Sequence, residues 1–292
     1  MTLSVQVGLA MALLTAFTSI LGFLYKHRGA VESPPVEARR PISSSIALFR
    51  SRWYTLGILV AMGSWGFHVA ALSLAPISLV QAMIAGGLVL LTVVADRLFG
   101  FTVTRREWIG VALTATGLAF LAATLDGTAD SAHSDYEPAA LALYAGLAGA
   151  GGMAVAVAAR DSLRGGALLG ASAGMIWGAS DVSIKALSGR LGDGALAVLA
   201  HPLALVILVA SLVGLAISAR SLQVGDAVPV IAVTATAANV ITIAAGPIVF
   251  GEPLPDEPLA LVARVAAFAL VIAAAALTPP PVRAVELQPA PG

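Results

Sequence analysis

The sequence has no cysteine and few charged residues for its length of 292 residues. Without cysteine, the chain can form no disulfide, bind no metal through thiolates and use no cysteine nucleophile. Charged residues make up 11% of the chain, whereas soluble domains carry about 25%. A soluble chain so poor in charge, and 59% hydrophobic, would aggregate. We therefore expect lipid to be the solvent for most of it.

Other absences exclude whole classes of function. No glycine-rich Walker loop ending in Lys-Ser or Lys-Thr is present, so we expect no ATP hydrolysis. No His-Glu-x-x-His motif of a zinc protease is present either. The formal net charge is +0, so no basic surface indicates nucleic acid. The sequence predicts neither an enzyme nor a bound cofactor.

Nine apolar stretches, each about as long as a membrane-crossing helix, fill most of the chain. A helix needs about 20 apolar residues to cross a hydrocarbon core of roughly 30 Å. We place the spans at residues 5–25, 54–74, 77–98, 107–125, 138–158, 166–187, 198–220, 226–249 and 259–277. The sequence therefore predicts an all-α integral membrane protein with nine transmembrane helices.

The positive charges fall unevenly on the two sides that this count creates. The first span has no basic residue before it and Lys26 and Arg28 after it, which favours a retained helix with its N-terminus outside. Of 16 Lys and Arg residues, only Lys185, Arg190 and Arg264 then lie outside or within a span. The remaining 13 lie in or beside cytoplasmic segments, among them loop 26–53 and the disordered tail 278–292. This bias predicts a plasma-membrane protein with a cytoplasmic C-terminus.

The spans form two similar groups of four, at 1–125 and 166–277, with the span 138–158 between them. The hairpin phrases Ser73–Gln81 and Ser221–Pro229 occupy the same place in the two groups, although only three of nine positions are identical. Four spans return the chain to its starting side, so a fifth crossing inverts the second group. We predict two inverted four-helix repeats joined by a linker helix, a common plan of transporters. The alternative is that alanine-rich helices resemble one another by composition alone.

Short motifs in both groups resemble the drug/metabolite transporter superfamily (EamA-like). Trp177-Gly178-Ala179-Ser180-Asp181, followed by Lys185, resembles that family's opening helix. Phe250-Gly251-Glu252-Pro253-Leu254 resembles its Gly-Glu-Arg-Leu phrase, as does Asp96-Arg97-Leu98 in the first group.

A second set of features is most similar to the NIPA-type magnesium transporters and their bacterial relatives. These features are the long loop after the first span, the phrase from Ala71 to Val80, and His201-Pro202-Leu203. The resemblance covers about residues 5–277 and implies a transporter. Members of the superfamily carry metabolites, amino acids, nucleotide sugars, drugs or divalent cations, so fold-level likeness does not choose a substrate.

Charged groups inside a predicted span are costly in lipid and are functional hypotheses for that reason. Asp181 lies in the sixth span, about 7 Å outside the midplane at 1.5 Å rise per residue. Trp177, Asp181 and Lys185 are four residues apart and share one helix face. We predict that Asp181 binds a cation or a substrate amine, or carries a coupling proton, and that Trp177 and Lys185 on the same face also belong to the substrate- or ion-binding site. The alternative is a local pair with Lys185, whose side chain reaches the outer surface.

Four more polar side chains lie within spans. His68 is a candidate proton carrier, or else bonds a neighbouring helix. Gln81 and Asn239 either line a cavity or join helices. Arg264 neutralises Asp181 or binds an anionic substrate group. Because spans 2, 3, 6 and 9 each place a polar group in the outer half, we expect one cavity approached from outside.

These observations predict a secondary active or facilitative transporter of a small metabolite or drug-like solute, working by alternating access. A magnesium or other divalent-cation transporter is the alternative, with Asp181 as the metal ligand. Such ions prefer several carboxylate oxygens, and only Asp181 offers one clearly within a span. A membrane enzyme, or a non-transporting partner subunit acting with lipid-linked substrates, is the alternative of another class. The expected partners are membrane lipid, the solute and coupled protons.

Overall fold

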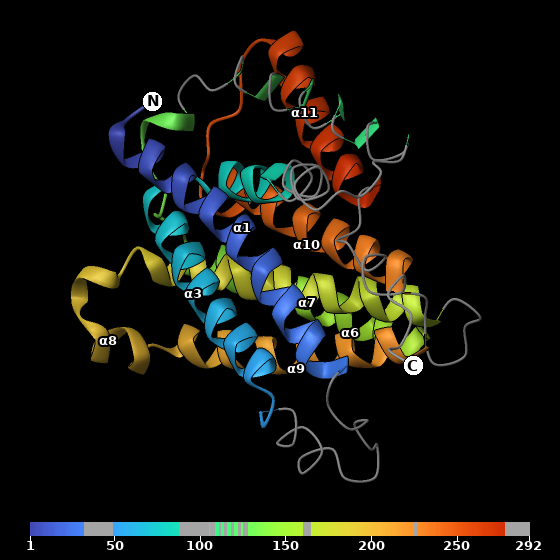
Figure 1. Cartoon of the computed structure of the whole chain (residues 1–292). Coiled ribbons are helices and arrows are strands. Elements are labelled where there is room, and N and C mark those ends of the chain that lie inside the picture. Colours follow the sequence, from blue (N-terminus) through green and yellow to red (C-terminus); the bar gives the residue numbers. More distant parts are fainter. Residues whose placement is uncertain are drawn as a thin grey trace.

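The computed structural model describes residues 1–31, 49–87, 128–159, 165–224 and 227–277, with isolated residues between 105 and 124. This part of the chain is helical and contains no strand. The long helices are α1 (Leu3–Val31), α3 (Arg52–Leu74), α6 (Pro138–Ala158), α7 (Gly165–Ser188), α9 (Pro202–Val224), α10 (Ala227–Val249) and α11 (Pro258–Leu277), shown in Figure 1. Most of the predicted loop 26–53, the phrase at 96–98 and the tail 278–292 lie outside the described residues.

Three of the described helices, α3, α6 and α7, are long and apolar enough to cross a membrane. Five shorter apolar stretches are also helical, at Leu3–Ser19, Ile77–Gly87, Pro202–Ser218, Val233–Val249 and Pro258–Ala274. Most of the predicted span 107–125 falls outside the described ranges. The all-helical class is therefore confirmed for these ranges, whereas the count of nine spans and the inverted repeat stay predictions.

The helix predicted at 198–220 begins and ends four residues later in the structure, as α9 at Pro202–Val224. A short helix, α8 (Ala195–Ala200), ends before His201, and α9 begins at Pro202. Proline is favoured at a first helical position because its missing N–H would have no partner there. The His201 side chain completes this start, since its Nδ1 accepts a hydrogen bond from Leu203 N at 3.2 Å.

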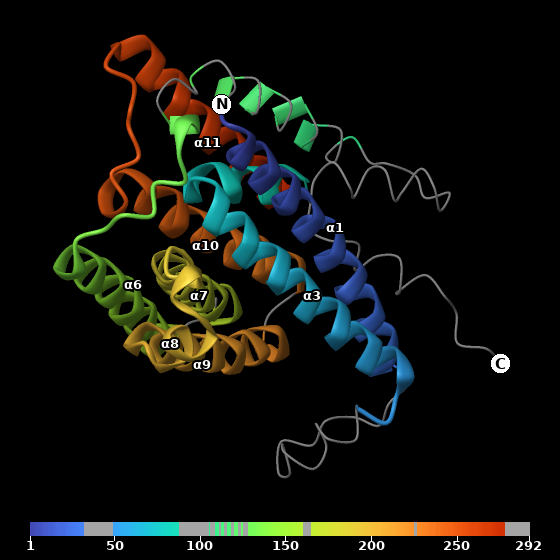
Figure 2. The same ribbon diagram turned by 90° about the vertical axis from the view of Figure 1, so that its left-hand side faces the viewer.

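The helices form two groups joined through α3 and α7. In the first group α1 packs along α3; in the second, α7 contacts α6, α9 and α10, and α10 contacts α11. Figure 2 shows α7 enclosed by its neighbours, with α1 and α3 on one side of it. Most of the second half of α7 is buried, from Ser180 to Ser188, apart from Asp181. Helix α7 therefore contacts helices of both groups, α3 in the first and α6, α9 and α10 in the second.

Glycines at every fourth position let α7 approach α10 closely. A Cβ atom on Gly174 would lie 2.2 Å from the carbonyl oxygen of Thr234, and one on Gly178 would lie 2.7 Å from Ile241 Cβ. Small residues at this spacing are typical of packed transmembrane helices. Residues 170–174 also spell Gly-x-Ser-x-Gly, the letters of a serine-hydrolase elbow. They lie inside a continuous helix, without the strand-to-helix turn that the elbow requires.

Replacing Gly174 with alanine is expected to destabilise the protein by about 1–3 kcal/mol, because the new methyl group meets backbone atoms of α10. The loss would be measured as a lower unfolding temperature of the purified protein in detergent. Gly63→Ala in α3 is the matched control, since a Cβ there has nothing within 4 Å. Equal unfolding temperatures for the two variants would contradict the close α7–α10 contact.

Several segments distant in sequence meet at one end of the bundle, which we call the N-terminal end (Figure 1). Thr2 N donates to Ala129 O at 3.3 Å, and Ser4 Oγ donates to Leu74 O at 3.4 Å. Thr128 Oγ1 in turn donates to Pro253 O at 2.9 Å. The start of α1, the end of α3, residues 128–129 and the loop after α10 therefore share this end.

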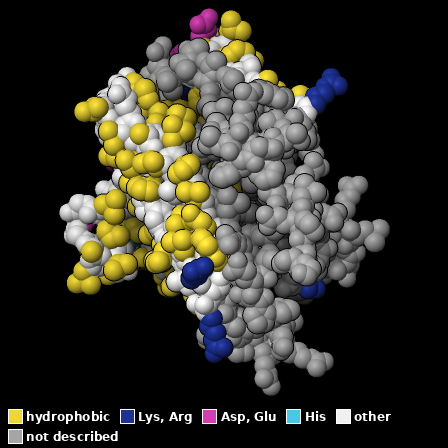
Figure 3. Space-filling model, in the orientation of Figure 1, with side chains coloured by type: hydrophobic (Ala, Val, Ile, Leu, Met, Phe, Trp, Pro, Cys, Tyr) yellow, Lys and Arg dark blue, Asp and Glu magenta, His cyan; other side chains and the backbone are white. Residues whose placement is uncertain are grey.

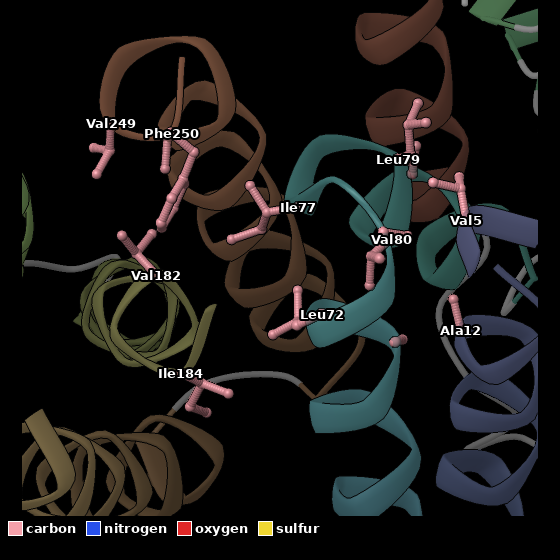
Figure 4. Close-up of a cluster of buried hydrophobic side chains, with 14 of the residues drawn as sticks. Val5, Ala12, Leu72, Ile77, Leu79, Val80, Val182, Ile184, Val249 and Phe250 are labelled. Atoms are coloured by element: carbon pink, nitrogen blue, oxygen red, sulfur yellow. The ribbon is translucent and has the colours of Figure 1, made fainter. Parts of the chain in front are cut away.

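The hydrophobic core lies near the N-terminal end (Figure 4). Its side chains come from α1, α3, the helical stretch Ile77–Gly87, α7 and the end of α10. Phe250 also makes an edge-to-face contact with Tyr136, with ring centroids 6.4 Å apart. Burial of these side chains stabilises the packing of these helices. The polar residues of the candidate site lie on the same helices.

Candidate functional site

Three of the predicted residues, His68, Gln81 and Asp181, come together one to two helical turns inside the N-terminal end. His68 Nε2 lies 3.3 Å from Asp181 Oδ1. Gln81 Nε2 donates to Asp181 Oδ2 at 3.4 Å. His68 belongs to α3, Gln81 to the helical stretch Ile77–Gly87, and Asp181 to α7. The site is therefore built from both groups of helices.

The Asp181 side chain is the most exposed of the three side chains in this site. Its side chain is 26% exposed, whereas that of His68 is 11% exposed and Gln81 is buried. Gln81 Nε2 donates to one carboxylate oxygen, and His68 Nε2 lies close to the other without hydrogen-bond geometry, so part of the carboxylate surface stays accessible to a solute. A cationic group can bind a carboxylate held in this way. An imidazole beside a carboxylate is also suited to take up and release a proton.

A metal centre has less support. No group of three or more His, Cys, Asp or Glu side chains suited to a metal ion occurs among the described residues. Divalent cations such as Mg²⁺ are bound through oxygen atoms, and Mg²⁺ usually keeps several waters. Of the three residues that meet here, Asp181 supplies carboxylate oxygens and Gln81 an amide oxygen. Asp181 as a metal ligand stays a prediction.

Lys185 is fully buried, and its ammonium group donates hydrogen bonds to backbone carbonyl groups. Nζ donates to Leu72 O at 2.6 Å, to Ala75 O at 2.9 Å and to Ala132 O at 2.6 Å. An ammonium group has three donors, so these carbonyls use all of them. The alternative in which Lys185 reaches the outer surface is therefore wrong, and binding of a substrate or ion by Lys185 stays a prediction. Its contacts give it a structural role, because it ties α7 to the end of α3.

Sequence reasoning missed Glu252, a buried carboxylate in the loop after α10. Its Oε1 accepts from Ser78 N at 3.3 Å, and Oε2 accepts a short hydrogen bond from Ser78 Oγ. Gly251, at φ +60, turns the chain so that Glu252 folds back over Gly246. The Gly-Glu phrase was the available signal, but Glu252 lies just beyond the predicted span and was not counted as an intramembrane charge.

Burial raises the pKa of Glu252 above the usual carboxyl value. The hydrogen bonds from Ser78 and the positive charges of Lys185 and His133 act in the opposite direction. The protonated form of Glu252 is therefore more favoured than that of an exposed glutamate.

Lys185 and Glu252 hold opposite sides of the turn at Ala75 and Pro76. Lys185 binds the carbonyl end of α3, and Glu252 binds the amide N–H at the start of the next helical stretch. A cation at a helix C-terminus and an anion at a helix N-terminus are each favourable. This turn positions His68 on one side and Gln81 on the other, so the two charges position the site.

Arg264 of α11 is buried at a second junction. Its Nε donates to Thr124 Oγ1 at 3.3 Å, and Nη1 donates to Thr128 Oγ1 and, at 2.8 Å, to Pro253 O. These contacts join α11 to the 128 turn and to the loop after α10. Neutralisation of Asp181, or binding of an anionic substrate group, stays a prediction for this residue.

Trp177 and Asn239 complete the predicted set. A Cβ on Gly214 would lie 2.5 Å from Trp177 Nε1, so the indole ring packs against α9. Asn239 is buried on α10. The structure thus brings three of the seven predicted residues into direct contact at one point, and gives Lys185 and Arg264 protein partners.

No protein-family model, curated protein or solved structure matches this chain.

Proposed function

We propose that this chain is a membrane transporter of a small solute, and that Asp181 receives a cationic group of the solute or a coupled proton. The observation that carries the proposal is the contact of Asp181 with His68 and Gln81 across the two helix groups. Transporters built from two repeats commonly hold their substrate at the repeat interface, near the middle of the bilayer. Asp181 is a partly exposed carboxylate between the two helix groups, about 7 Å outside the predicted midplane.

The exposed hydrophobic side chains of the helices favour a location in the lipid bilayer. Large hydrophobic side chains are exposed along α3, α6, α9 and α11, including Leu59, Met62, Leu143, Leu147, Leu205, Leu212, Leu259 and Val262. Hydrophobic side chains also dominate the described part of the face drawn in Figure 3. Contiguous apolar surface of this extent is rare on water-soluble monomers and typical of surfaces that contact lipid or another protein.

The meeting of distant segments at the N-terminal end supports the predicted nine crossings. The start of α1, the turn at Ala75, residues 128–137, the end of α7 and the loop after α10 are the segments that nine spans put outside. An odd number of crossings between any two of these segments would separate those two by the thickness of the bilayer. We therefore propose nine spans, with the second helix group inverted relative to the first.

The absence of cysteine makes this topology directly testable, since single cysteines can be added to the natural chain. Asp193 is exposed between α7 and α9, and Arg50 is exposed just before α3. A membrane-impermeant maleimide is expected to label the D193C variant in intact cells. It should label the R50C variant only after the membrane is permeabilised. Labelling of both in intact cells would contradict the proposed orientation.

The function itself is tested by flux into proteoliposomes that contain the purified protein. The solutes form a panel of small amines and other metabolites, with Mg²⁺ as the divalent cation, each measured with and without a proton gradient. Protein-dependent flux of an organic cation supports the proposal. Flux of Mg²⁺ alone replaces it with the divalent-cation function. No flux for any solute would instead favour a non-transporting partner subunit.

A further inference from the structure

A groove of about 800 Å³ lies between α6 and α9 and has α7 as its floor. Leu141 and Met153 of α6, Ile176 of α7, and Leu205 and Val209 of α9 are among its apolar walls. None of His68, Gln81 and Asp181 lines it. Its volume is within the range of ligand-binding cavities, roughly 300–1,000 Å³. The groove is therefore a second place where this chain can hold a molecule.

The strongly polar side chains of the groove lie at one end. Arg190 follows the end of α7 and His201 precedes the start of α9, both at the N-terminal end. His201 Nδ1 accepts from Leu203 N at 3.2 Å, so the neutral ring carries its proton on Nε2, which remains a donor. Ser183, deeper in the groove, is already bonded to Ala179 O at 2.9 Å. The mouth offers the Arg190 cation and two further donors, His201 Nε2 and the Tyr136 hydroxyl, above an apolar interior.

The groove is long enough to cover one leaflet of a bilayer. Along α6 it extends from Pro138 to Met153, and along α9 from Pro202 to Val213. At 1.5 Å per residue these stretches are about 22 Å and about 17 Å long. One leaflet contributes about half of a hydrocarbon core of roughly 30 Å. A chain that enters at the membrane surface therefore fits as far as the midplane.

Gly146 and Gly149 shape the α6 wall. A Cβ atom on either residue would have no heavy atom within 4 Å. Gly151 and Gly152 differ, since a Cβ on each would meet a side chain of α7 at 2.9 Å or less. The run Gly149-Ala150-Gly151-Gly152 therefore contains two glycines packed against α7, Gly151 and Gly152, and one that faces the groove, Gly149.

We propose that this groove binds an anionic phospholipid, with an acyl chain along α6 and α9 and the phosphate at Arg190 and His201. The proposal rests on the membrane orientation given above, in which the N-terminal end lies at the outer surface. Arginine binds phosphate through paired, charge-assisted hydrogen bonds. A freely diffusing apolar solute would have no use for a cation at the mouth, whereas a phospholipid presents a phosphate at that depth.

Native mass spectrometry of the detergent-purified protein tests the proposal. Phosphatidylglycerol and phosphatidylcholine with the same dioleoyl chains are added separately, and inorganic phosphate is added as a competitor. We expect phosphatidylglycerol to be retained in preference to phosphatidylcholine. The variant R190Q should retain it roughly fivefold less, and R190K to an intermediate degree, because lysine keeps the charge but loses the paired geometry.

A second variant tests the apolar part of the same groove. G149L should fill the groove and reduce retention roughly as much as R190Q, by occluding apolar contact area. G66L is the control, because a Cβ on Gly66 of α3 also has nothing within 4 Å but lies outside the groove.

Three outcomes would overturn the lipid proposal. They are equal retention of the two lipids, unchanged retention by G149L, and loss of the bound species to inorganic phosphate alone. A wild-type dimer that G149L converts to a monomer would show that a second copy of the chain covers the groove. Retention is measured without flux, so its result is independent of whether Asp181 supports transport.

Discussion

Replacing Asp181 with asparagine is expected to reduce flux at least about tenfold while the protein still folds and inserts. The substitution keeps the shape of the side chain and removes the negative charge that a cationic group would bind. A hydrogen bond to a charged group contributes about 1.5–3 kcal/mol, which corresponds to roughly 10- to 150-fold in affinity. The measurement is initial flux in proteoliposomes, over a range of solute concentrations.

Two controls separate loss of function from loss of structure. D193N removes an exposed carboxylate at the same end of the molecule and should leave flux unchanged. H68Q removes the imidazole but keeps a polar side chain against Asp181. If a proton is coupled through this contact, H68Q loses the stimulation of flux by a proton gradient. Unchanged flux in D181N, at equal amounts of inserted protein, would remove Asp181 from the proposed mechanism.

The gathering of His68, Gln81 and Asp181 followed from the sequence because each residue is a polar group at a similar depth in an apolar span. Polar groups at membrane depth avoid lipid and seek one another or a cavity. The bounds of α6 were also predictable. Pro138 begins an apolar run, and the side chain of Glu137 caps it by accepting from Ala140 N at 2.6 Å.

The partners of Lys185 and Glu252 could not be predicted in the same way. Lys185 binds carbonyls up to 113 residues away, and Glu252 binds an amide 174 residues away. No periodicity or motif within one helix specifies such contacts, because they depend on how the two helix groups pack. Within the helix, Asp181 is the nearest ionisable side chain on the same face as Lys185. The sequence therefore suggested Asp181 as the partner of Lys185.

Replacing Lys185 with methionine is expected to be among the most destabilising single changes in the protein. Methionine fills a similar volume but leaves the carbonyls of Leu72, Ala75 and Ala132 without this donor. It also leaves Glu252 buried without its nearby cation. Each buried carbonyl left without its hydrogen-bond donor costs about 1–3 kcal/mol. The effect is measured by thermal unfolding of the purified protein, in which the variant is expected to unfold at a much lower temperature than the wild type or to show no cooperative transition.

The acid dependence of this variant distinguishes the charge effect from simple loss of packing. The positive charge of Lys185 lowers the pKa of Glu252, so K185M raises that pKa further above its unfolded value. A carboxyl whose pKa is raised on folding favours the folded state when it is protonated. The stability of K185M should therefore be greatest at low pH and fall as the pH rises from the unfolded carboxyl value through the folded one.

The double variant K185M/E252Q should remove this pH dependence and recover part of the lost stability. Glutamine still accepts a hydrogen bond from Ser78 but leaves no unpaired charge in the interior. Because the two residues interact, their separate effects should not add, and a double-mutant cycle measures the difference. E257Q, at an exposed carboxylate, is the control and should shift stability by less than about 0.5 kcal/mol. Additive effects of K185M and E252Q, with no change in pH dependence, would show that the two charges act independently on the turn that positions His68 and Gln81.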